Sequence, residues 1–229
     1  MDKKVLKKAE RIDKLLAEVY GEKKYEAKTD PLTELVLTVL SQNTNDTNRD
    51  RAFEALKAKY PTWEKLANAD KKALAETIKV GGLANTKSGR ILKMIRSIKK
   101  ERNNLNLDFL NEMPDNEVQE YLLKIDGVGP KTVACVLAFA MGRDVMPVDT
   151  HVHRVSSRLE LIPPKMTAEK AHEYFLQFKG IVSLYQFHLN LIAHGRMLCK
   201  ARNPLCEKCN LKRLCGYYAD NVKNKGQAA

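Results

Sequence analysis

The sequence contains no run of eighteen apolar residues, although 44% of its 229 residues are hydrophobic. A helix that crosses a membrane needs about 20 mostly apolar residues, so we expect no membrane span. The first twenty residues lack the apolar core of a secretory signal, and they include acidic side chains such as Asp2 and Glu10, which organellar presequences avoid. No stretch alternates apolar and polar residues as a half-buried strand does. These absences predict a soluble, intracellular protein without a β-sheet core.

Acidic residues are outnumbered by basic ones, with 28 Asp and Glu against 40 Lys and Arg, which gives a formal net charge of +12. The hydrophobic content is that of a globular chain and not of a disordered one. A folded protein with this excess of positive charge attracts polyanions. The charge therefore predicts a polyanionic partner.

The apolar residues that are present recur mostly at helical spacing. Near the N-terminus, Val5, Ala9, Ile12, Leu16 and Val19 form one stripe, which predicts an amphipathic helix docked on a core. The segment "TDPLTELVLTVLS" begins with an Asp-Pro helix start and continues as a buried helix. Similar patterns follow, separated by Gly, Pro, Asn or Asp. We expect an all-α fold of about ten short helices.

Cysteines are few, and four of the five lie within seventeen residues in "CKARNPLCEKCNLKRLC". Thiolates this close repel one another unless a metal neutralises them, and a reducing compartment argues against two disulfides. The ligand set fits tetrahedral zinc or an iron-sulfur cluster. Zinc ribbons usually have two symmetric Cys-x2-Cys knuckles, so the unequal spacing here favours [4Fe-4S]. The cysteines are Cys199, Cys206, Cys209 and Cys215, and basic residues between them, including Lys200 and Arg202, suit phosphate binding.

The segment "LLKIDGVGPKT" predicts two helices joined by a tight hairpin that contains Gly127 and Gly129. Such a turn points backbone N–H groups outward at a helix N-terminus and binds a phosphate without reading sequence. Lys131 follows in the first turn of the second helix, where the helix dipole disfavours a cation. A solvated lysine or a phosphate contact would explain it. The alternative is a nucleophile, because the neutral amine is the reactive form.

Asp149 lies directly before an expected helix that starts at Thr150. An aspartate there is a common N-cap. Capping is compatible with catalysis, because backbone N–H groups hold the carboxylate rigid and ionised, ready to stabilise a developing cation.

The hairpin with Lys131, the "VDTHVHRV" segment with Asp149 and the cysteine array together resemble the endonuclease III family of helix-hairpin-helix DNA glycosylases. The resemblance covers nearly the whole chain. It implies that Lys131 attacks the sugar C1′ of a flipped nucleotide, expels the base and forms a Schiff base, after which β-elimination nicks the strand. It also implies that Asp149 is the catalytic aspartate and that the four cysteines hold a [4Fe-4S] cluster. The implied partner is double-stranded DNA containing damaged bases or abasic sites.

The family fold implies two domains. Residues 24–143 would form a six-helix domain with the hairpin, and residues 1–23 and 144–229 would form a helical iron-sulfur cluster domain. The resemblance places Lys131 and Asp149 on the two walls of a cleft between these domains. We also expect a monomer.

The residues that would enter the DNA match the family's pattern less well. In the loop "SQNTND", the family's glutamine falls on Asn43 in an ungapped match, so that Gln42 or Asn43 fills the hole left by the flipped base. Asp46 matches a polar position that helps to read the lesion. Leu83, in "GGLANTK", is similar to the family's apolar wedge.

We therefore expect a bifunctional glycosylase and abasic-site lyase that removes oxidised pyrimidines. One alternative is a related glycosylase for uracil or mismatched bases, and another is a non-catalytic iron-sulfur DNA-binding module. For a prokaryotic source we expect a cytoplasmic protein associated with the nucleoid.

Overall fold

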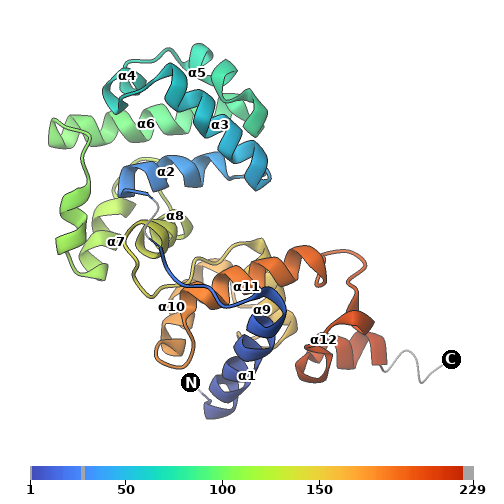
Figure 1. The fold of residues 1–229 in the computed structure, drawn as a ribbon. Helices are drawn as coiled ribbons and strands as arrows, with labels where there is room; N and C mark the ends of the chain where they lie inside the picture. The colour runs from blue at the N-terminus through green and yellow to red at the C-terminus, as the bar shows by residue number, and fades with distance from the viewer. Residues whose placement is uncertain (1, 27–28, 224–229) are drawn as a thin grey trace. The chain divides into compact units, whose positions relative to one another are not determined.

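The computed structural model describes residues 2–26 and 29–223, in which all regular structure is helical. The prediction of an all-α fold is confirmed, and no helix in these residues is long and apolar enough to cross a bilayer. The α-helices are α1 (Lys3–Tyr20), α2 (Pro31–Leu40), α3 (Asp46–Lys59), α4 (Trp63–Ala67), α5 (Lys71–Thr77), α6 (Ala84–Arg102), α7 (Asp115–Leu123), α8 (Pro130–Cys135), α9 (Thr150–Arg158), α10 (Ala168–Phe175), α11 (Leu184–Met197) and α12 (Gly216–Tyr218) (Figure 1). Short 3₁₀ or π segments are η1 (Lys79–Gly81), η2 (Asp108–Glu112), η3 (Val136–Ala140), η4 (Leu176–Phe178), η5 (Cys206–Lys208), η6 (Lys212–Leu214) and η7 (Ala219–Lys223).

The chain divides into two compact units. One comprises the chain up to Glu26 together with the chain from Asp144 onward. The other is the segment between them, which ends at Arg143 and contains α2 to α8. We call the first the terminal unit and the second the central unit.

Helix α2 is the buried helix of the central unit. Its start is fixed by Asp30, whose Oδ1 accepts a hydrogen bond from the N–H of Thr33 at 2.9 Å, and by Pro31 at the first position. It contacts α3, α6 and α8 (Figure 1). Because neighbours cover several of its sides, its sequence is apolar almost all round. Its buried apolar side chains are Pro31, Leu32, Leu35, Val36, Val39 and Leu40.

Helix α1 docks in the terminal unit against α11 (Figure 1). Ala9, Ile12 and Leu16 are fully buried in the core, as the stripe predicted. Val19 is 51% exposed, so its place on the buried stripe was wrong. The neighbouring Tyr20 packs against the core in the last turn of α1 instead.

Helices α9 and α11 pack closely in the same unit. Gly195 of α11 allows this approach, because a Cβ added there would lie 3.1 Å from the Cβ of His151 on α9. The helix that begins after Asp149 is therefore held firmly within the terminal unit.

Candidate functional site

The predicted hairpin joins α7 to α8 in the central unit. The N–H of Val128 donates to the carbonyl of Ile125 at 3.1 Å, and Gly127 has a φ of +86°, which favours glycine. A Cβ added at Gly127 or at Gly129 would meet nothing within 4 Å. The backbone of the turn is therefore open to a ligand.

Lys131 is the second residue of α8 and is partly buried. Helix α8 packs against α2. Burial raises the pKa of Glu34 on α2, and the charge of Lys131 makes a small contribution that opposes this rise. The lysine therefore interacts electrostatically with a carboxyl group within its own unit.

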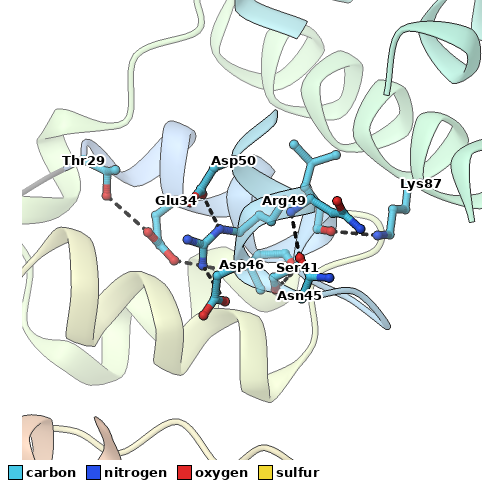
Figure 2. A network of polar contacts seen from close by, with 11 residues as sticks. Thr29, Glu34, Ser41, Asn45, Asp46, Arg49, Asp50 and Lys87 are labelled. Atoms are coloured by element: carbon cyan, nitrogen blue, oxygen red, sulfur yellow. Dashed lines mark hydrogen bonds and ion pairs between the residues drawn. The ribbon is translucent and has the colours of Figure 1, made fainter. Parts of the chain in front are cut away.

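Glu34 belongs to a polar network that the sequence analysis missed (Figure 2). Burial is the main influence on its carboxyl and raises its pKa from 4.5 to about 7. Hydrogen bonds from the hydroxyls of Thr29 and Thr38, each at 3.2 Å, oppose this rise, as does the charge of Arg49. The available signal was a single charged residue in "PLTELVLTVL", a segment that is otherwise uncharged and mostly apolar.

The polar loop consists of residues 41–45 and connects α2 to α3. Asn43 is exposed and has a left-handed φ of 49°. Asn45 caps α3 by accepting the N–H of Asn48 at 2.8 Å. Gln42 is partly buried, and its Oε1 accepts a hydrogen bond from Nη1 of Arg90 at 2.6 Å. Asp46, the first residue of α3, is exposed.

Arg49 lies among three carboxylates. It pairs with Asp46 at 3.3 Å and with Asp50 at 2.8 Å, and it interacts electrostatically with Glu34 (Figure 2). These interactions connect the start of α3, just after the polar loop, to Glu34 on α2.

A second exposed turn consists of residues 81–83 and is called the leucine turn here. Gly82 has a φ of +71° and Leu83 a φ of 48°. The side chain of Leu83 is 54% exposed. An apolar side chain presented on a left-handed turn suits a wedge between bases.

Lys87 of α6 is the other residue that the sequence analysis missed. It is only 1% exposed, and burial lowers its pKa. Helical periodicity offered a signal, because Lys87 lies four residues before the buried Ile91. A lysine in "NTKSGRI" nevertheless looks like a solvated surface residue.

Asp149 is the N-cap of α9, as predicted, and lies in the terminal unit. Its Oδ1 accepts the N–H of Val152 at 2.7 Å. The carboxylate also raises the pKa of His151, but burial of the imidazole is the larger influence and lowers it overall. A capped carboxylate is held in one orientation and is available to a developing positive charge.

The four cysteines Cys199, Cys206, Cys209 and Cys215 line one cavity, together with His194. Burial, with a smaller contribution from the other three cysteines, raises the pKa of the Cys209 thiol to about 11. A thiolate there consequently requires a cation. In the part of the chain that the structure describes, no three His, Cys, Asp or Glu side chains are arranged to hold a single metal ion.

Side chains around this cavity fix it to the rest of the terminal unit. Arg158 of α9 donates from Nη1 to Sγ of Cys199 at 3.3 Å and to the carbonyl of Lys200 at 2.8 Å. His194 is buried, and its Nδ1 lies 3.1 Å from the hydroxyl of Tyr20. Lys200 and Arg202 are exposed on the loop that follows Cys199.

Comparison with known proteins gives a consistent result. The family description "HhH-GPD superfamily base excision DNA repair protein" matches residues 36–179. Endonuclease III of Sulfolobus acidocaldarius is 34% identical over 83% of this chain and 83% of its own length. Endonuclease III of Thermotoga maritima is 35% identical over 86% of this chain and 88% of its own length.

Solved structures share the fold. An endonuclease III trapped as a covalent intermediate with DNA has a TM-score of 0.79 and 24% identity, covering 98% of this chain and 99% of that one. A thermostable thymine-DNA glycosylase has a TM-score of 0.76 and 22% identity, covering 93% of this chain and 97% of that one.

Proposed function

Since this chain belongs to the HhH-GPD superfamily of base excision DNA repair proteins, we propose that it removes oxidised pyrimidines from double-stranded DNA through a Schiff base on Lys131. The enzyme class is a DNA glycosylase with abasic-site lyase activity, as in its endonuclease III relatives. The observation that carries the mechanism is the lysine in the first turn after an open glycine hairpin.

The proposed reaction begins with a nucleotide turned out of the duplex, which costs a few kcal/mol and is easiest for a damaged base. The neutral amine of Lys131 forms a bond to C1′, and the bond between C1′ and the base breaks, so that the base leaves with its electron pair and takes up a proton. Opening of the sugar ring gives the imine. Loss of a proton from C2′ then expels the 3′ phosphate, and the strand is nicked.

Asp149 is proposed to stabilise the positive charge that develops on the sugar. Its Oδ1 accepts a hydrogen bond from the N–H of Val152, which fixes the orientation of the carboxyl group. A negative charge that needs no reorganisation is the most effective kind in a transition state.

Asn43 is proposed to fill the space left by the flipped base. It is exposed on the polar loop, whereas Gln42 is occupied by Arg90. Leu83 is proposed as the wedge and Asp46 as a residue that reads the lesion. The open turn at Gly127 and Gly129, together with Lys200 and Arg202, would bind phosphates.

A [4Fe-4S] cluster is proposed at Cys199, Cys206, Cys209 and Cys215. Each cysteine of such a cluster binds a different iron, whereas zinc draws four sulfurs to about 2.3 Å from one ion. Four cysteines around one cavity, with unequal spacing along the chain, favour the cluster. When bound, it would neutralise the thiolates and hold the loop with Lys200 and Arg202 in shape.

A second candidate is a glycosylase for uracil or mismatched thymine. The observation that favours it is Asn43. This side chain is shorter than the family's glutamine, so it fills the space left by the flipped base differently. Excision from a panel of duplexes containing thymine glycol, 5-hydroxycytosine, uracil or a G·T mismatch distinguishes the two candidates.

The mechanism is tested by borohydride trapping on duplexes with thymine glycol or an abasic site. The expected result is a covalent complex on both duplexes, lost in Lys131→Ala. The matched control is Lys124→Ala, since Lys124 is an exposed lysine at the end of α7. Trapping that survives in Lys131→Ala would overturn the assigned nucleophile, and trapping on the abasic duplex alone would overturn the proposed substrate.

A further inference from the structure

Lys87 is one of the largest fully buried side chains in the described residues. Its Nζ donates to the carbonyl of Leu40 at 2.7 Å and to the carbonyl of Gly81 at 2.7 Å. Burying an ammonium group is costly unless its protons are satisfied. The two short hydrogen bonds to backbone carbonyls satisfy the buried ammonium group. Through them, Lys87 joins two segments that are separate in the sequence.

The two carbonyls lie where the polar loop and the leucine turn begin. Leu40 is the last residue of α2, where carbonyls lack helical partners and the dipole favours a cation, and the polar loop follows it. Gly81 is the last residue of η1 and the first of the leucine turn. The ammonium group of Lys87 therefore binds the residue just before the polar loop and the first residue of the leucine turn.

The backbone of Lys87 holds the leucine turn from its other side. Its N–H donates to the carbonyl of Leu83 at 2.9 Å. One residue thus fixes both ends of the turn that presents the Leu83 side chain.

Neighbouring groups leave little freedom around this junction. A Cβ added at Gly81 would lie 3.2 Å from Cβ of Ala52 on α3, so the turn is packed against that helix. One helical turn after Lys87, Arg90 binds Gln42 in the polar loop at 2.6 Å. Helix α6 therefore binds the residue just before the polar loop and one residue within it, and the leucine turn directly precedes this helix.

We propose that Lys87 is a positioning residue that makes the polar loop and the leucine turn a single rigid unit, so that both enter the DNA helix together when a base leaves it. This rests on the proposed function, which assigns Asn43 and Leu83 to the DNA. The geometry of the junction itself does not depend on that assignment.

The first test is hydrogen exchange of the full-length protein carrying Lys87→Met. Amides in residues 41–45 and 81–84 are expected to exchange at least about tenfold faster, because a hydrogen bond to a charged group is the stronger kind. The matched control is Arg96→Met. Arg96 also lies on α6 and donates to two carbonyls, of Ala67 at 2.8 Å and of Ala69 at 2.9 Å, away from both segments. Equal effects of the two variants on residues 41–45 and 81–84 would overturn the proposal.

A measurement on the unmodified protein covers the case in which Lys87→Met does not fold. Under native conditions with rising urea, the amides of Ser41 and Lys87 are expected to open with the same free energy, since they belong to one unit. Opening at clearly different urea concentrations would overturn the proposal.

The functional test compares two reactions of one enzyme. Lys87→Met is expected to slow single-turnover excision of thymine glycol about tenfold more than it slows nicking at a preformed abasic site, because only the first requires a base to be extracted. Arg96→Met is expected to change both equally. An unmodified enzyme that neither excises nor nicks would refute the proposed function. An active enzyme in which Lys87→Met slows both reactions alike would refute the positioning role alone.

Discussion

The hydroxyl of Thr38 donates a hydrogen bond to Oε1 of Glu34, one helical turn earlier, at 3.2 Å. Thr29 donates to the other carboxyl oxygen, also at 3.2 Å. Although both bonds stabilise the carboxylate, burial outweighs them and the pKa of Glu34 remains at about 7. The Glu34 carboxyl, which interacts electrostatically with Lys131, therefore changes charge near neutral pH.

Replacing Glu34 by Gln should remove a pH dependence of stability. Because the pKa of Glu34 in the folded protein lies above 4.5, its stabilising contribution is complete below pH 4.5 and is lost as the pH rises through about 7. Glu34→Gln should match the unmodified protein at low pH and exceed it at pH 8 by at most about 3 kcal/mol. Urea unfolding between pH 5 and pH 8 measures this. Glu76→Gln, at an exposed position, is the control, and a difference that does not vary with pH would contradict the prediction.

Gly129→Ala should separate DNA binding from folding. The added Cβ meets no protein atom within 4 Å and the φ of Gly129 is −116°, so the free energy of unfolding should change by less than about 0.5 kcal/mol. The methyl group would lie where a phosphate approaches the turn, so the affinity for duplex DNA should fall. Fluorescence anisotropy with a labelled duplex measures the affinity.

Gly127→Ala should lower both stability and affinity, since a φ of +86° costs alanine about 1 kcal/mol or more. The control is Gly180→Ala, at a φ of +76° with equally open space. It should lose similar stability and keep its DNA affinity. Weaker binding by the Gly180 variant would show that strain alone explains the loss.

Asp149 should show separable roles in capping and in charge. Asp149→Asn keeps an oxygen that can accept the N–H of Val152, so its stability should stay close to that of the unmodified protein. Asp149→Ala should lose about 1 kcal/mol. Both should lose excision of thymine glycol, measured in single turnover, because both lack the negative charge. An active Asp149→Asn enzyme would show that the carboxylate serves only as a cap.

The metal content should follow the four clustered cysteines and not the fifth. Protein purified without oxygen should contain iron and acid-labile sulfide in equal amounts, as a [4Fe-4S] cluster requires. Cys206→Ala should lose both, whereas Cys135→Ala, buried in the central unit, should retain them. Stoichiometric zinc in place of iron would refute the cluster.

The sequence by itself determined the features that depend on neighbours along the chain. Asp30, Asn45 and Asp149 cap helices because their side chains reach N–H groups three residues later. The hairpin at Gly127 follows from local backbone freedom. The cysteine array is likewise a matter of spacing, which is why these features were predictable.

Only the tertiary structure decided the rest. Val19 follows the apolar stripe of α1 and yet is exposed, because the last turn of that helix packs Tyr20 against the core instead. Gln42 and Arg90 meet although 48 positions separate them. From the sequence alone, Lys87 looks like a surface lysine. In the folded protein its ammonium group is buried and binds the carbonyl of Leu40, which is 47 positions away. Local propensity specifies a helix and its ends, whereas the surroundings of a charge depend on which distant segments pack around it.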